Sequence, residues 1–359
     1  MVSNRVHSAR HRIMHDTPTR AGTMNVRPLV ALLLAFGCAP SPDETVVNLA
    51  PPPEDRSGFT HIEPGGFKIN YNRENVPAKK ANLGDTDIVM GVVVDGQARA
   101  YPVNFMTGPI NEVVNDHLGK MNIAVTWCSV DYSGVVYQRE FDGRPFHFGV
   151  LGMDNGAMVL YDRQTGSHWN QLFGKAVDGK MEGQKLKKLP SSLTTWKQWV
   201  DRHPETTVYI NRRVPYQSQF TSATIRELAN KPSGATLGAT DLVLALEGHI
   251  DAKVYPLSRL ANDRVVNDTF EDIPILVIMS EDLSTAKIYD RRLDGHALTF
   301  KTSWFGGKLV DSETGSEWDV LTGADVSNAD RALQPIPATY VLWYAWKAYR
   351  PDTTIHGDS

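Results

Sequence analysis

The sequence predicts a β-rich α+β fold, built as a tandem duplication of one domain with mainly antiparallel strands. The segment from residue 83 to about 208 recurs from 237 to about 354, in the same order and with small gaps. Within one copy, short apolar runs alternate with turn signals, and helical signals are few. A period this long indicates two related domains rather than a solenoid. We expect these domains at residues 57–214 and 215–354, with a tail at 355–359.

Several short motifs carry the repeat. Trp196 and Trp199 of the first copy match Trp343 and Trp346 of the second, so these aromatic rings are expected to fill equivalent spaces in two cores. The matching segments are Leu83–Val89 with Leu237–Val243, Ala98–Val103 with Ala252–Leu257, Val113–Asp116 with Val265–Asp268, Tyr137–Gly143 with Tyr289–Gly295, Thr165–Trp169 with Thr314–Trp318, and Pro204–Thr207 with Pro351–Thr354.

The elements of the first copy follow from the alternation of apolar runs and turn residues. Strands are predicted at 88–94, 98–101, 120–127, 135–141 and 158–161. Asp95-Gly96 and Asp142-Gly143 are typical of hairpin turns, and Asp154-Asn155-Gly156 indicates a turn with positive φ. One helix is predicted over Thr194–Arg202, because Trp196, Trp199 and Val200 share a face and His203-Pro204 ends it.

Cys128 is the candidate functional residue with the clearest setting. It ends the predicted strand 120–127, and Ser133-Gly134 is expected to turn the chain into the next strand. A reactive group at a strand end can be held rigidly while it faces a substrate. The alternative is a buried structural cysteine, because free cysteine is among the most buried residue types.

Comparison of the two copies separates residues that build the fold from residues that carry chemistry. Asn115, Asp116, Asp162 and Trp169 persist in the second copy and are interpreted first as hydrogen-bonding and packing anchors. The first copy alone has Cys128 (Ser280 in the second), Glu112 (Arg264), Arg163 (Ser312), Gln171 (Val320), His117 (Thr269), His147 (Thr299) and His168 (Glu317). We therefore expect the chemistry to lie in the first copy, with the second as its structural partner.

The proposed catalytic set is Cys128, Arg163, Asp162 and Glu112. A thiolate is the competent nucleophile, so a reactive cysteine needs a cation or a hydrogen-bond donor nearby. Further candidates in the first copy are His117, His147, His168, Asn155 and Gln171.

A metal site is a second hypothesis. Cys128, His147 and His168, with His117, would form a soft N/S ligand set suited to Cu(I) or Zn. The sequence has no CxxC or HxxxH spacing, and it identifies no cofactor.

The N-terminal region resembles a bacterial lipoprotein signal. From Met24 the pattern runs through Arg27 and the apolar stretch 29–36 to Gly37-Cys38, and Cys38 is the expected lipidation site. The alternative is a plain cleaved secretory signal. The Pro-rich segment 39–56 reads as an extended tether. A lipid anchor at Cys38 would place the protein in the cell envelope, at a membrane surface, and would leave Cys128 without an intramolecular disulfide partner.

The composition is that of a soluble globular protein. The chain has 359 residues, of which 41% are hydrophobic and 22% charged, with a formal net charge of -4. This charge gives no argument for a nucleic-acid partner.

Motifs across most of the first copy resemble the bacterial domain-of-unknown-function 3179 family. They are Ala100-Tyr101-Pro102, Asn111–Asp116, Thr126-Trp127-Cys128, Leu160–Ser167, Trp169-Asn170-Gln171, and Thr194-Thr195-Trp196 with His203-Pro204. The resemblance carries over no biochemical activity, but it implies a secreted or membrane-anchored protein. Some members have selenocysteine at the position of Cys128, which implies redox or nucleophilic chemistry there.

The chain departs from this family pattern at two positions. Many members have His where Asn111 stands and a second cysteine where Asp131 stands. Without that cysteine, a mechanism with a single cysteine would need an external thiol or redox partner. Three hypotheses therefore remain: thiol redox chemistry at Cys128, soft-metal binding, and a noncatalytic two-domain binding module.

Overall fold

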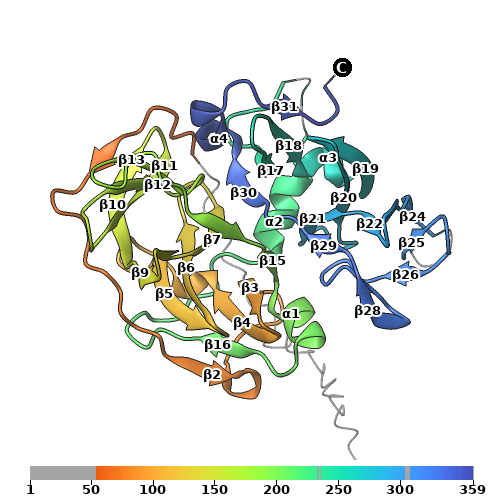
Figure 1. The fold of residues 1–359 in the computed structure, drawn as a ribbon, viewed down its shortest axis with the longest axis horizontal. Helices are drawn as coiled ribbons and strands as arrows, with labels where there is room; N and C mark the ends of the chain where they lie inside the picture. The colour runs from red at the N-terminus through yellow and green to blue at the C-terminus, as the bar shows by residue number, and fades with distance from the viewer. Residues whose placement is uncertain (1–53, 233, 235, 304–307, 359) are drawn as a thin grey trace, which may run out of the picture. The chain divides into compact units, whose positions relative to one another are not determined.

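The computed structural model describes residues 54–232, 234, 236–303 and 308–358 (Figure 1). The predicted signal segment, Cys38 and the tether as far as residue 53 lie outside the described residues. The described chain is β-rich, and its sheets are mainly antiparallel, as the sequence predicts. The predicted domain boundaries stay predictions.

The first sheet is organised around the predicted hairpin at Asp95-Gly96. Both residues have positive φ, 49° and 74°, which a type I′ turn requires. The sheet order is β15-β3-β4-β16-β2, and only β16 and β4 pair in parallel. Its strands are β2 Asn75–Pro77, β3 Ile88–Val94, β4 Gln97–Pro102, β15 Ser192–Thr195 and β16 Thr207–Tyr209.

The second sheet carries Cys128 at the end of its long strand β6, and its order is β14-β7-β6-β5. The predicted turn at Ser133-Gly134 is wrong, because both residues belong to β7 and Ser133 pairs with Cys128. The turn is Ser129–Tyr132 instead. The strands are β5 Val113–Leu118, β6 Met121–Cys128, β7 Ser133–Gln138 and β14 Lys187–Leu189.

The third sheet of the first half packs over the cysteine strand, and its order is β1-β10-β11-β12-β13. A two-stranded ribbon, β8 and β9, precedes it. The strands are β1 His61–Ile62, β8 Glu140–Phe141, β9 Arg144–Pro145, β10 Phe148–Asp154, β11 Ala157–Asp162, β12 His168–Asn170 and β13 Lys175–Asp178.

The second half has three sheets and a ribbon: β30-β17-β18-β31, β19-β20-β21-β29, β24-β25-β26-β27-β28 and β22-β23. Their central strands match the first half in order, but the edge strands β1 and β2 have no counterpart, and β28 is an addition. In the first of these sheets β31 pairs in parallel with β18, as β16 pairs with β4 in the first half. The strands are β17 Leu242–Glu247, β18 Ala252–Pro256, β19 Val265–Phe270, β20 Ile273–Met279, β21 Ala286–Asp290, β22 Arg292–Leu293, β23 His296–Ala297, β24 Phe300–Thr302, β25 Leu309–Asp311, β26 Glu317–Trp318, β27 Ala324–Asp325, β28 Asn328–Ala332, β29 Gln334–Pro335, β30 Thr339–Leu342 and β31 Thr354–Ile355.

The residues interpreted as anchors make the same hydrogen bonds in both halves. Each bond joins side chains or backbone at matching positions. The pairs are Asn115 Nδ2 to Phe148 O (2.8 Å) and Asn267 Nδ2 to Phe300 O (2.7 Å), Trp169 Nε1 to Asp162 (3.0 Å) and Trp318 Nε1 to Asp311 (2.9 Å), and the hydroxyl of Tyr101 to Asp116 (2.7 Å) and of Tyr255 to Asp268 (2.8 Å).

The predicted helix forms, but it begins two residues later, at Trp196, because Thr194 and Thr195 belong to β15. The Thr195 side chain caps it by accepting from the Gln198 amide. Its Trp199 packs against Gly91, where an added Cβ would overlap the ring. The helical segments are η1 Ala78–Lys80, η2 Val103–Phe105, α1 Trp196–Arg202, α2 Ser222–Ala229, α3 Leu257–Leu260 and α4 Trp343–Tyr349.

None of the helices in the described part of the chain is long and apolar enough to span a bilayer.

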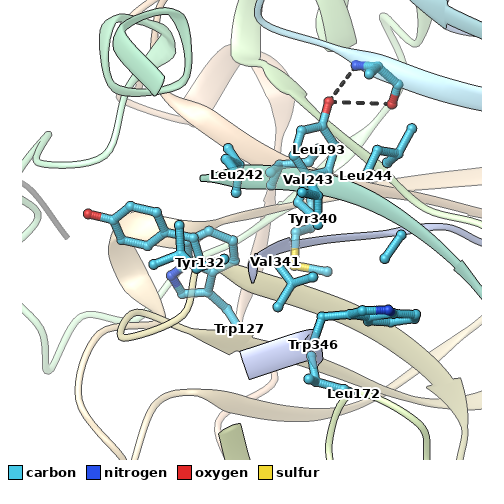
Figure 2. Packing of buried hydrophobic residues seen from close by; sticks show 14 of the residues in the cluster. Trp127, Tyr132, Leu172, Leu193, Leu242, Val243, Leu244, Tyr340, Val341 and Trp346 are labelled. Atoms are coloured by element: carbon cyan, nitrogen blue, oxygen red, sulfur yellow. Dashed lines mark hydrogen bonds between the residues drawn. The ribbon is translucent and has the colours of Figure 1, made fainter. Parts of the chain in front are cut away.

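One apolar core joins the two halves (Figure 2). It brings residues of the first half together with residues of β17, β30 and α4. Those that Figure 2 labels are Trp127, Tyr132, Leu172 and Leu193 with Leu242, Val243, Leu244, Tyr340, Val341 and Trp346.

Each half also contacts the turn that follows the long middle strand in the other half. From the first half, Gln198 of α1 donates from Nε2 to Asp282 Oδ2 of the second half at 2.9 Å. From the second half, the hydroxyl of Tyr344 in α4 donates to Val130 O of the first half at 3.2 Å. Each helix therefore packs on the sheet of its own half and also contacts the turn of the other half.

Candidate functional site

Cys128 lies directly beneath a surface turn. It is the last residue of β6, its exposed fraction is 0%, and apolar side chains such as Val113 and Val135 belong to the same buried cluster. The next residue, Ser129, is exposed. The turn Ser129–Tyr132 therefore separates the thiol from solvent.

Two buried carboxyl groups accompany this thiol. Glu112 Oε1 accepts hydrogen bonds from Ser129 Oγ at 2.8 Å and from the Ser129 amide at 3.3 Å. Asp131 Oδ1 accepts from the Ser133 amide at 2.9 Å. Asp131 Oδ2 is buried and has no hydrogen-bonding partner of ordinary geometry among the described groups, although the Cys128 thiol lies near enough to interact with this carboxyl. We call Cys128, Glu112 and Asp131 the acidic thiol cluster.

Burial dominates the protonation of the acidic thiol cluster. It raises the pKa of Glu112 to about 7 and the pKa of Asp131 to about 6. It also raises the pKa of the Cys128 thiol well above its ordinary value, and the two carboxylates add to this effect. No Lys, Arg or His of the described residues forms an ion pair with either carboxyl group. At neutral pH the resting thiol is therefore protonated, while both carboxyl groups titrate close to neutrality.

Gln171, a candidate from the sequence, adjoins the acidic thiol cluster through Ser133. Ser133 Oγ donates to Gln171 Oε1 at 3.0 Å, and Gln171 Nε2 donates to Thr126 Oγ1 at 2.9 Å. Thr126 in turn donates to the carbonyl of Val135 at 2.8 Å. This buried chain of hydrogen bonds fixes the start of β7 opposite Cys128.

Residues of the second half also reach the turn above Cys128. The Leu342 amide donates to the carbonyl of Asp131 at 2.8 Å, and the Tyr344 hydroxyl donates to that of Val130. Burial raises the pKa of Tyr344, with further contributions from Asp131 and Cys128. The comparison of the copies selected only residues that the first copy alone has, so it did not select Tyr344 of the second copy. Lys197 stands at the matching position in the first half, and this difference is the signal that could have identified Tyr344.

Asp131 was the second residue missed as part of the site. The position stands out in the sequence as a departure from the pattern of the family that the chain resembles, but that departure indicates only the absence of a second cysteine. The structure adds a carboxyl group that faces the thiol from three residues further along the turn.

Arg163 and His147 lie in a separate, more exposed group. Arg163 Nη1 donates to the Tyr71 hydroxyl at 2.8 Å, and His147 Nε2 lies 3.5 Å from Arg73 Nη2. Burial and the neighbouring arginines lower the pKa of His147. These contacts do not involve Cys128, so neither residue supplies the cation that was expected beside it.

The remaining candidates are each bound to other neighbours. Asp162 is buried and occupied as an acceptor for Trp169 and Thr165, which explains its presence in both halves. The other contacts are His168 Nδ1 to Asp178 Oδ2 (3.2 Å), His117 Nδ1 to Asn122 Oδ1 (3.4 Å), and Asn155 Nδ2 to Asp154 Oδ2 (3.3 Å) in the predicted positive-φ turn.

The predicted metal ligands do not meet. Across residues 54–232, 234, 236–303 and 308–358, no three His, Cys, Asp or Glu side chains form a group that could hold a metal ion. Cys128, His147 and His168 therefore do not form the soft-metal set that the sequence suggested.

The comparisons with known proteins agree with the motifs around this site. No curated protein and no solved structure matches the chain. The sequence model described as "Protein of unknown function (DUF3179)" matches residues 69–353, a range that includes the acidic thiol cluster and both halves. The chain therefore belongs to the DUF3179 family.

Proposed function

We propose that this protein performs thiol-based redox chemistry at Cys128, with Glu112 and Asp131 handling the proton of the thiol. The single observation that supports this function is the burial of three acidic groups together without a compensating cation. Such burial destabilises the folded state, and groups with strongly perturbed pKa values concentrate at functional sites. A purely structural cysteine needs apolar neighbours only.

The reaction that fits one cysteine is thiol–disulfide exchange with external partners. The Cys128 sulfur attacks one sulfur of an external disulfide, the external S–S bond breaks, and a mixed disulfide forms. The thiol proton passes to Asp131 or Glu112 and then to the departing thiolate. An external thiol next attacks the mixed disulfide, which restores the Cys128 thiol and yields a new external disulfide.

Access to Cys128 requires that the turn Ser129–Tyr132 move. Tyr132 has φ of 57°, a left-handed conformation that is rare for bulky residues. Strained residues of this kind cluster at functional sites. Its ring is held by Phe220, with centroids 4.8 Å apart, so the turn is strained but supported.

The test measures the reaction of Cys128 with dithiodipyridine in the Cys38→Ser background, where Cys128 is the remaining thiol. One equivalent should react in the native protein, and Glu112→Gln and Asp131→Asn should slow the reaction near pH 7. Glu205→Gln, an exposed carboxyl elsewhere, is the matched control and should leave the rate unchanged. A native thiol that stays unreactive for hours, while the urea-unfolded chain reacts at once, would leave Cys128 as a structural cysteine.

We also propose that the chain is anchored in the cell envelope through a lipid on Cys38. The support is the order of the basic residue, apolar stretch and cysteine in residues 24–38. An extracytoplasmic location would supply the disulfides that exchange at Cys128 requires.

We infer in addition that the two halves arose by tandem duplication. The matching strand orders and the three pairs of matching hydrogen bonds support this origin.

A further inference from the structure

A pocket of about 410 Å³ opens between helix α1 and the second half, at the end of β20. We propose that it binds a small organic anion, whose carboxylate pairs with Arg264 and whose apolar body fills the space beyond. The inference does not depend on chemistry at Cys128.

The pocket occupies the place that the acidic thiol cluster occupies in the first half. The Met279 amide donates to the carbonyl of Arg264 at 2.9 Å, as the Trp127 amide donates to that of Glu112 at 2.9 Å. Ser280, the next residue, lines the pocket at the position of Cys128. The second half therefore has the cation Arg264 where the first half has the acid Glu112. This reversal of charge makes the position suitable for binding an anion.

Arg264 is the cation available to a ligand. The other two cations of the pocket are paired, Arg202 with Asp319 and Lys308 with Glu317 at 2.8 Å. The half-buried Arg264 guanidinium makes no hydrogen bond or ion pair with any other described residue, which leaves its planar donors free for a carboxylate.

The acidic groups of the pocket do not neutralise Arg264. Asp201 pairs with Lys197 at 3.0 Å, and Asp319 and Glu317 hold the two cations named above. Glu281 lies at the exposed rim and forms no ion pair within the described part of the chain. A ligand carboxylate at Arg264 would therefore meet one competing carboxylate, at the solvent side.

Part of the remaining lining is apolar, and the neutral polar side chains of Gln198, Ser280, Thr285 and Thr302 make up the other part. Ile278, Leu309, Leu321 and the ring of Trp318 form walls, and Val326 stands at the rim with an exposed fraction of 60%. A pocket of this volume, in which apolar walls stand beside polar groups that can orient a ligand, is typical of small-molecule sites. The apolar lining favours an anion with a hydrocarbon or aromatic body over an inorganic ion.

Calorimetric titration of the full chain tests the inference with phenylacetate as the probe and phenylacetamide as its neutral counterpart. Phenylacetate should bind one site about tenfold or more tightly than the amide, because only the acid forms a charge-assisted pair with Arg264. Arg264→Gln should remove this preference, and Arg213→Gln, an exposed arginine outside the pocket, should not. Thermal unfolding of both variants checks that they fold.

Three further measurements locate and identify the site. Val326→Asp should weaken phenylacetate binding by placing a negative charge at the rim, while Glu281→Gln should tighten it by removing one. Cys128→Ser should leave it unchanged. Equal affinity for phenylacetate and its amide, retention of the preference in Arg264→Gln, or inorganic phosphate binding as tightly as phenylacetate would each overturn the inference.

Discussion

Glu112→Gln should stabilise the folded protein above neutral pH. The folded-state pKa of about 7 exceeds the ordinary value of 4.5, so the folded state binds more protons than the unfolded chain between these values. The free energy of unfolding should therefore fall as the pH rises through this window and level off above pH 7. The gap between 4.5 and about 7 corresponds to about 3 kcal/mol.

Glu112→Gln removes this fall in the free energy of unfolding, because glutamine has nearly the shape of glutamate but does not ionise. A glutamine keeps an oxygen that can accept from the Ser129 hydroxyl and amide, and Glu112 is only 6% exposed, so solvent screens its charge weakly. We expect Glu112→Gln to match the native protein near pH 4.5 and to exceed it by about 3 kcal/mol at pH 8. Asp131, whose folded pKa is about 6, contributes a similar fall that is complete at a lower pH.

Urea unfolding at pH values from roughly 2 to 8.5, in steps of roughly half a unit, measures both curves. Glu271 provides a control of opposite sign, because three backbone amides lower its pKa to about 2. Glu271→Gln should reduce stability at neutral pH, and that loss should disappear in acid. A Glu112→Gln variant that is less stable than the native protein at pH 8 would refute the assignment of Glu112 as an uncompensated buried acid.

Two further predictions concern the fold and the location. Trp318→Ala should destabilise the protein by about 3 to 5 kcal/mol, because the ring is buried and its Nε1 bonds to Asp311; urea unfolding measures the loss, and Val326→Ala at an exposed site should cost far less. Cys38→Ser should release the protein from the membrane fraction of its host, and unchanged membrane association would count against lipidation at that residue.

The sequence predicted the local structure where a residue type has one physical reason for its position. Asp95-Gly96 turns the hairpin because both residues adopt positive φ, and α1 ends before Pro204 as expected. Ser133-Gly134 misled because Gly134 serves close packing instead of a turn: a Cβ there would lie 2.8 Å from the Met90 sulfur. The turn is Ser129–Tyr132, and its positive-φ position is occupied by Tyr132, a residue type that gives no turn signal.

The composition of the site was only partly predictable. Differences between the copies identified Cys128, Glu112 and Gln171, which do lie together. The same comparison also selected Arg163 and His147, which gather on another part of the first half. Residue type alone does not say which strand ends meet, and that depends on contacts between distant segments such as Tyr344 and Val130.

The contact that each helix makes with the other half has an evolutionary consequence. Because Gln198 of α1 contacts the second half and Tyr344 of α4 contacts the first, a gene that lost either half would expose an apolar surface and uncover the remaining turn. The second half, which lacks the cysteine, therefore covers the turn above Cys128 through Tyr344 of α4. The pocket at Arg264 shares no lining residue with the acidic thiol cluster, so substitutions in that pocket can change its ligand without altering the surroundings of Cys128.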